Sequence, residues 1–173
     1  MAASDIRLIV SDVDGVWTDG RIIYASDGTE IKEFNVRDGL AAKLAQRVGV
    51  TVALLTSRRS AALERRAKEL GITELHQGAA NKLAELEKLA QRVGVTFAQI
   101  LYAGDDLPDL APMSRVAISA APADACAEVR DIATWKLTAN GGRGAFRELV
   151  ERLLRERGDW DTVVSELADV ASV

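Results

Sequence analysis

The sequence predicts an α/β protein built on a doubly wound parallel sheet. Short apolar runs alternate with longer segments of helical period, which is typical of consecutive βαβ units. The chain has 173 residues, of which 48% are hydrophobic and 5% aromatic, so one domain with a full core is expected. Glycines follow several of the helical segments, where a residue with positive φ closes a helix. These three observations favour a single globular domain.

The elements follow in chain order. Strands are expected at residues 7–10, 51–55, 100–103, 116–119 and 134–137. Helices are expected at residues 39–48, 60–70, 80–93, 123–130 and 144–156. Residues 159–173 carry Trp160 and Leu167 at mixed spacing, which predicts either a loosely docked helix or a flexible tail. We therefore separate a domain of residues 1–158 from a C-terminal tail.

One insertion, at residues 20–34, interrupts the alternation. It is expected to form two strands, residues 21–25 and 30–34, joined through Asp27-Gly28, a favoured tight turn. Placed directly after the first strand, this β-hairpin would overhang the carboxyl edge of the sheet as a flap or a subunit contact. A purely solvated decoration is less favoured, because a lone hairpin is only marginally stable in water.

Composition excludes several classes of function. The net charge of -4 disfavours a general nucleic-acid binder, which needs clustered Lys and Arg. No signal peptide and no apolar run of about 18 residues is present, so we expect a cytoplasmic protein without membrane contact. Cys126, the single cysteine, is expected to be structural. His76, the single histidine, is expected to have a surface or structural role.

An acid pair follows the first strand. Asp12 and Asp14 stand two residues apart, directly after an apolar run. The carboxyl ends of parallel strands face the crevice where doubly wound folds bind ligands. Two carboxylates there repel each other unless a cation or a shared proton relieves them. The pair therefore implies a divalent metal, a phosphoryl or acyl nucleophile, or both.

Two further polar groups follow the second strand. Thr56, Ser57, Arg58 and Arg59 stand at a helix start, where backbone N–H groups bind anions, although Thr and Ser are also common helix caps. Lys82 lies near the amino end of the next helix, where the helix dipole disfavours a cation unless an anion compensates it. A solvated lysine is the alternative.

An acidic loop follows the strand at residues 100–103. Asp105, Asp106 and Asp109 lie within five residues and need a cation or a basic partner. Alternatively, Asp106 or Asp109 caps a helix. In a parallel sheet this loop, the acid pair, the hydroxyl cluster and the lysine converge on one crevice, and their order along the chain is more specific than any one of them.

The pattern Asp-x-Asp-Gly-Val, then Thr, then Lys, then Gly-Asp-Asp-x-x-Asp resembles the haloacid dehalogenase superfamily of phosphotransferases, which has a Rossmann-like fold. The match covers about residues 6–154. The small members without a cap domain, the 3-deoxy-D-manno-octulosonate 8-phosphate phosphatases, resemble this chain most. The narrower signals are residues 35–39 (Asn-Val-Arg-Asp-Gly), residues 75–78 (Leu-His-Gln-Gly) and the glycine-rich residues 141–145.

The resemblance implies roles for the acid pair. Asp12 would be the nucleophile that forms an aspartyl phosphate, and Asp14 the general acid and then base. Mg²⁺ would be held by the carboxylates of Asp12 and Asp105 and by the backbone carbonyl of Asp14, all hard oxygen ligands.

The resemblance also implies how the phosphoryl group is held. Thr56 Oγ, the Ser57 N–H and the Lys82 ammonium would contact its oxygens. Asp106 and Asp109 would act through water or by orienting Lys82.

The sugar acid would be bound by a larger set of residues: Asn35, Val36, Arg37, Asp38, Gly39, Lys43, Ser57, Arg58 and Arg66. Arginines suit a substrate carboxylate because they pair with it bidentately, although a solvated helix face is the alternative for Arg66. Two positions depart from the family pattern. Ser57 stands where glycine is common and Lys43 where arginine is frequent, which leaves the fine substrate preference open.

Without a cap domain, water must be excluded by other means. Similar enzymes form tetramers in which hairpins pair, and a flap and C-terminal segment cover a neighbour's site. Arg143 would then serve a neighbouring subunit, or else a helix start.

The resemblance thus implies a Mg²⁺-dependent phosphatase of 3-deoxy-D-manno-octulosonate 8-phosphate in lipopolysaccharide biosynthesis. The alternatives are a phosphatase of a nine-carbon neuraminate-like acid, a broad sugar phosphatase, or a non-catalytic oligomeric interaction module. A receiver domain is contradicted by Asp14, since it predicts no second aspartate two residues after the phosphorylated one.

Overall fold

A six-stranded parallel sheet forms the centre of the molecule, as predicted. The computed structural model describes residues 3–170. The strands lie in the order β5-β4-β1-β6-β7-β8, and every neighbouring pair is parallel. Their bounds are Leu8–Ser11 (β1), Thr51–Thr56 (β4), Glu74–Gln77 (β5), Ile100–Ala103 (β6), Ile118–Ala121 (β7) and Trp135–Lys136 (β8). The chain runs outward from β1 on one side and returns to β6 on the other, so the strand order reverses beside β1, where such folds bind ligands.

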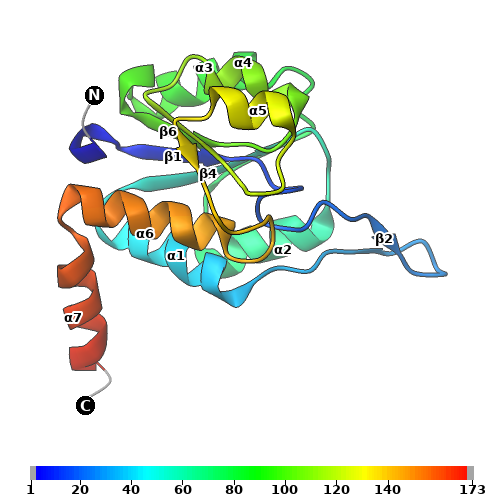
Figure 1. The fold of residues 1–173 in the computed structure, drawn as a ribbon. Coiled ribbons are helices and arrows are strands. Elements are labelled where there is room, and N and C mark those ends of the chain that lie inside the picture. The colour runs from blue at the N-terminus through cyan, green and yellow to red at the C-terminus, as the bar shows by residue number, and fades with distance from the viewer. Residues whose placement is uncertain (1–2, 171–173) are drawn as a thin grey trace.

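Helices cover both faces of the sheet (Figure 1). One layer contains α1 (Val36–Arg47), α2 (Ala61–Leu70) and α6 (Ala145–Arg157), and the other contains α3 (Lys82–Val93), α4 (Leu110–Met113) and α5 (Ala127–Ile132). Short 3₁₀ turns lie at Ala3–Asp5, Phe97–Gln99 and Leu107–Asp109. Each helix layer packs on its face of the sheet and forms an apolar core. In the first core the ring centroids of Trp17 and Phe146 lie 4.3 Å apart, and in the second Tyr102 is buried.

Some element boundaries differ from the predicted ones. The strand β5 was not among the predicted strands because Glu74–Gln77 lies at the sheet edge and is only half-buried, so it lacks an apolar run. Helix α1 begins at Val36 and not at residue 39, because Gly39 lies inside the helix and does not mark its start. Helix α5 begins at Ala127 and not at residue 123, since residues 122–125 form a turn.

The predicted hairpin exists but its paired strands are short. Only β2 (Ile23–Tyr24) and β3 (Glu30–Ile31) pair, which is less than the predicted 21–25 and 30–34. Gly28 takes a positive φ in the turn, as an Asp-Gly turn requires. The hairpin projects from the domain on the side opposite to the C-terminal helix (Figure 1).

Most of the C-terminal segment forms a helix, α7 (Trp160–Val170), as in the docked-helix alternative, and residues 171–173 of the predicted tail lie outside the described residues. It follows α6 after Gly158, which has a positive φ. Val163 is buried, and Trp160 lies under the guanidinium groups of Arg147 and Arg155 at 5.2 and 4.8 Å. Within residues 3–170 no helix is long and apolar enough to cross a membrane.

Candidate active site

A crevice of about 270 Å³ opens at the carboxyl ends of β1, β4 and β6. It gathers the polar groups predicted from the sequence, which are Asp12, Asp14, Thr56, Ser57, Arg58, Lys82, Asp105, Asp106 and Asp109. A larger hollow of about 510 Å³ lies next to it, beyond β5, and contains none of the predicted catalytic residues.

The turn after β1 brings the acid pair to the crevice. Asp12 continues the sheet, since its N–H donates to the Ala103 carbonyl at 2.9 Å. Gly15 follows with a positive φ of 97°, and a side chain there would collide with the Asp105 carboxylate. The glycine-rich block supports this turn from behind, because a side chain at Gly141 would collide with the Gly15 carbonyl. Glycines on both sides therefore let the acidic loop and the acid pair approach each other.

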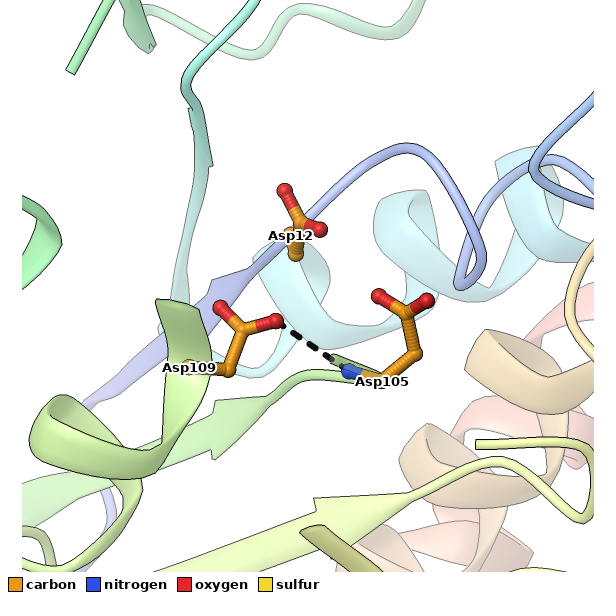
Figure 2. A group of neighbouring side chains, drawn as sticks. All are labelled: Asp12, Asp105 and Asp109. Carbon is orange, nitrogen blue, oxygen red and sulfur yellow. Dashed lines mark hydrogen bonds between the residues drawn. The ribbon is translucent and has the colours of Figure 1, made fainter. Parts of the chain in front are cut away.

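Three carboxylates meet in this crevice, from Asp12, Asp105 and Asp109 (Figure 2). One oxygen of each lies within 4.8 Å of the others. Both oxygens of the Asp109 carboxylate have hydrogen-bond partners. Oδ1 accepts from the Tyr102 hydroxyl at 2.8 Å and from Lys82 Nζ at 2.7 Å, and Oδ2 accepts from the Asp105 N–H at 3.2 Å. Asp109 therefore acts as a fixed support for its neighbours.

Asp12 and Asp105 remain as an electrostatically strained pair. Burial and the charge of Asp109 raise the pKa of Asp12 to about 6. Burial and the charges of Asp12 and Asp109 raise the pKa of Asp105 to about 8. Asp105 Oδ1 is buried without a hydrogen-bond partner within the described residues. A hard divalent cation such as Mg²⁺ suits these two carboxylates, since it would replace the missing partner and cancel the repulsion.

Lys82 brings a positive charge to the Asp12 and Asp109 carboxylates. It is the first residue of α3, after the cap Asn81, and is 6% exposed. Its Nζ lies 3.0 Å from Asp12 Oδ1 and 2.7 Å from Asp109 Oδ1. Although burial acts to lower the pKa of Lys82, the two carboxylates raise it above its ordinary value. The lysine is therefore buried and charged, unlike the solvated lysine considered as the alternative.

The end of β4 forms the opposite wall. Thr56 is buried, and its Oγ1 accepts from the Arg58 N–H at 3.2 Å. The Ser57 hydroxyl donates to the Ala79 carbonyl at 2.9 Å, so it fastens the loop to the segment after β5. Arg58 donates to Glu30 at 2.7 Å, and its Nε lies 3.8 Å from Asp14 Oδ2.

Three residues at this site were not predicted from the sequence. Lys32, on the hairpin, pairs with the Asp14 carboxylate, and its side chain is 3% exposed. Glu30 on the same hairpin pairs with Arg58. Their spacing of two, which places both side chains on one face of a strand, was the available signal. Tyr102 was hidden in an apolar strand, although a buried tyrosine hydroxyl needs a partner.

Several predicted substrate-binding residues do not line the crevice of their own chain; in the described residues these are Asn35, Val36, Arg37, Asp38, Gly39, Lys43 and Arg66. Asn35 caps α1 by accepting from the Arg37 N–H at 2.9 Å. Asp38 is buried and accepts from the Arg147 N–H at 2.7 Å, and burial raises its pKa to about 6. Arg66 lies over Gly39, where a side chain would collide with its guanidinium group.

Two other predicted residues have local partners. Asp106 accepts from the Leu107 N–H at 2.8 Å and caps the turn Leu107–Asp109, as in the helix-cap alternative. Arg143 lies 3.9 Å from Asp19 on the surface.

Comparison with known proteins places the chain in a family. No protein-family model matches it. The 3-deoxy-D-manno-octulosonate 8-phosphate phosphatase KdsC of Escherichia coli K12 is 40% identical over 159 residues, which cover 92% of this chain and 85% of the relative. The chain belongs to the 3-deoxy-D-manno-octulosonate 8-phosphate phosphatase family. The resemblance inferred from the motifs is thereby confirmed.

Solved structures of this phosphatase family share the fold. The Moraxella catarrhalis phosphatase, in complex with magnesium ion, phosphate ion and KDO, has a TM-score of 0.93, 38% identity and coverage of 95% of both chains. The cobalt-bound Haemophilus influenzae phosphatase has a TM-score of 0.88 and 38% identity, and the match covers 91% of this chain and 92% of that one. The predicted haloacid dehalogenase fold is confirmed.

Proposed function

We propose that this protein is a Mg²⁺-dependent phosphatase that hydrolyses 3-deoxy-D-manno-octulosonate 8-phosphate to the free sugar acid and phosphate. One observation carries the proposal: Asp12 lies between the Lys82 ammonium, 3.0 Å away, and the carboxylate of Asp105, whose buried Oδ1 has no hydrogen-bond partner within the described residues. A carboxylate nucleophile, a fixed ammonium and a second carboxylate able to bind a hard metal ion, all in one crevice, are the parts that phosphoryl transfer needs. The relatives named for this activity support the choice of substrate.

The catalytic steps follow from the roles of the acid pair. The Asp12 carboxylate attacks phosphorus, and the bond from phosphorus to the sugar oxygen breaks. Asp14 donates a proton to that oxygen and then takes one from the water that hydrolyses the aspartyl phosphate. Lys82, Thr56 Oγ and the Ser57 N–H stabilise the charge on the phosphoryl oxygens.

Bound Mg²⁺ would be held by the carboxylates of Asp12 and Asp105 and the carbonyl of Asp14, and would neutralise phosphoryl charge. Lys32 and Arg58, which flank Asp14, keep that carboxyl at the mouth of the crevice, where the sugar oxygen leaves.

The assembly that we propose is a homotetramer in the cytoplasm, with the hairpins at its interface. The hairpin exposes Ile22, Ile23, Tyr24 and Ile31, with Tyr24 64% exposed, and Val36 at its base is 77% exposed. A projecting apolar strand pair is stable only when something packs on it. Val36, Arg37 and Arg143 are exposed and do not line their own crevice, so they would then reach the sugar acid in a neighbouring subunit. Asp38 and Gly39 are buried in their own chain and would shape this segment from below.

A phosphate-release screen tests the function. The panel contains the eight-carbon acid phosphate, a nine-carbon neuraminate-like acid phosphate and simple sugar phosphates, each with Mg²⁺ or with EDTA. We expect the eight-carbon acid to be preferred, with release that needs Mg²⁺ and is lost in Asp12→Asn. Preference for the nine-carbon acid, or equal rates on all sugars, would support the alternatives that Ser57 and Lys43 leave open. No release from any ester would refute the proposal.

A further inference from the structure

The end of β5 and the two residues after it join the two walls that hold the phosphoryl group in the proposed mechanism. Residues 76–79 (His-Gln-Gly-Ala) border the adjacent hollow of about 510 Å³ and do not line the catalytic crevice. Because β5 pairs with β4 in register, His76 lies beside Leu55 and Gln77 beside Thr56. On its other side the segment leads into α3, which begins with Lys82.

Gln77 fixes the start of α2 and the loop before it. Ser60 is the first residue before α2, but its own side chain makes no capping hydrogen bond. Instead Gln77 Oε1 accepts from the Ser60 N–H at 2.7 Å, while Gln77 Nε2 donates to Glu64 in the first helical turn at 2.9 Å. Gln77 thus accepts from the N–H of the N-cap residue, as the third helical residue does in a capping box, and anchors the start of α2 to β5.

The main chain of the same segment clamps the loop from Thr56 to Arg58. The Gly78 N–H donates to the Arg58 carbonyl and the Ala79 N–H to the Thr56 carbonyl, both at 3.1 Å. The Ser57 hydroxyl donates to the Ala79 carbonyl at 2.9 Å. Gly78 has a positive φ of 74°, and a side chain there would press on the Arg59 guanidinium. All three residues of the Thr56 loop are thus tied to one short segment.

His76 fixes the helix that carries the lysine. Its side chain is 11% exposed, and Nδ1 lies 2.9 Å from Glu85 Oε1. Glu85 is in the first turn of α3, three residues after Lys82, so it shares a helix face with the lysine. The other ring nitrogen, Nε2, lies 2.6 Å from Arg92, which also pairs with Glu74 at 2.5 Å. The imidazole is thereby held from both sides.

We infer that His76 and Gln77 are positioning residues for phosphoryl transfer: Gln77 holds the Thr56 loop, and His76 holds the helix start that carries Lys82. One strand end thereby sets the separation between the donors on the two walls. This inference rests on the proposed function, because it concerns donors to a phosphoryl group. Such donors act through preorganisation, and a displacement of about 1 Å lowers the rate by about a hundredfold.

The test compares apolar with conservative replacements. We expect Gln77→Met and His76→Leu each to lower kcat/KM at least about tenfold and to raise the inhibition constant of inorganic phosphate by about the same factor, since the same donors hold both. In the double variant Gln77→Glu with Glu64→Gln, a carboxylate at position 77 accepts from the Ser60 N–H and from the new amide at position 64. Both hydrogen bonds of position 77 are thereby restored, and most of the lost kcat/KM should be recovered. His76→Gln keeps a hydrogen-bond donor for Glu85, so it should lower kcat/KM less than His76→Leu does.

The matched control is Lys88→Gln, which removes the other partner of Glu85, 3.3 Å away on the exposed side of α3. It should leave both constants unchanged. If His76 and Gln77 had a merely structural role, their variants would have lower kcat and thermal stability but an unaltered inhibition constant for phosphate. That pattern would overturn the inference, and so would variants that show no change at all. An inactive wild type would instead refute the proposed function, and the inference with it.

Discussion

Replacing Asp105 with asparagine should stabilise the metal-free protein at neutral pH and abolish its stabilisation by Mg²⁺. The pKa of Asp105 is raised from 3.8 to about 8 by burial and by Asp12 and Asp109, whereas in the unfolded chain it returns to about 3.9. Between the unfolded-state pKa and pH 7 lie about 3 pH units, and at about 1.36 kcal/mol each they correspond to a loss of about 4 kcal/mol of folding free energy. This is an upper bound because the repulsion is shared with Asp12, and we expect about 2 kcal/mol.

The sign of the pH dependence follows from the raised pKa. A folded state that binds the proton more tightly is favoured at low pH, so wild-type stability should fall as the pH rises from about 4 to about 8. Asparagine cannot ionise, so the variant's advantage over the wild type should grow across that interval. Urea unfolding in EDTA at pH 4.5, 7 and 8 measures it. Adding Mg²⁺ should then stabilise the wild type alone, because only the wild type keeps both carboxylate ligands.

Asp106→Asn is the matched control for this experiment. Asp106 belongs to the same loop but is exposed, and asparagine caps a helix as well as aspartate does. Its stability should follow that of the wild type at every pH, with the Mg²⁺ response kept. The reasoning is refuted if Asp105→Asn is no more stable than the wild type in EDTA at pH 7, or if Mg²⁺ stabilises both equally.

Three further predictions concern other parts of the molecule. Lys82→Met leaves Asp12 and Asp109 without their shared cation, so phosphate release should fall at least about a hundredfold and the unfolding free energy by about 3 kcal/mol; a variant that keeps a tenth of the rate contradicts this. Asp38→Asn keeps the acceptor for the Arg147 N–H and removes a carboxyl whose pKa is raised to about 6. In urea unfolding, the free energy of unfolding of this variant should match that of the wild type near pH 4 and exceed it by about 2 kcal/mol at pH 7. A difference that does not change with pH would contradict the raised pKa of Asp38. Tyr24→Asp on the exposed hairpin should reduce the particle mass measured by light scattering at micromolar concentration, and a monomeric wild type would refute the proposed tetramer.

The central sheet was predictable because each of its inner strands is a short, mostly apolar run that is buried along nearly its whole length. Residues 100–103 are an example, predicted and observed with the same bounds. The strand β5 was not predictable in this way, since Glu74–Gln77 contains only one apolar residue, Leu75, and is half-buried along its length. The start of α1 was predicted at Gly39 because glycine is normally disfavoured inside a helix. The packing of Arg66 against Gly39 explains why a glycine stands inside this one.

The order of motifs along the chain by itself determined which groups meet at the carboxyl edge of the sheet, because in a parallel sheet every strand end points to the same side. That is why Asp12, Thr56 and Asp105 were expected together and do line one crevice. Only the tertiary structure decided the partners of individual charges. Lys32 reaches Asp14 across 18 residues, and Asp38 reaches Arg147 across 109. Such pairs depend on how separate elements pack, which no local periodicity encodes.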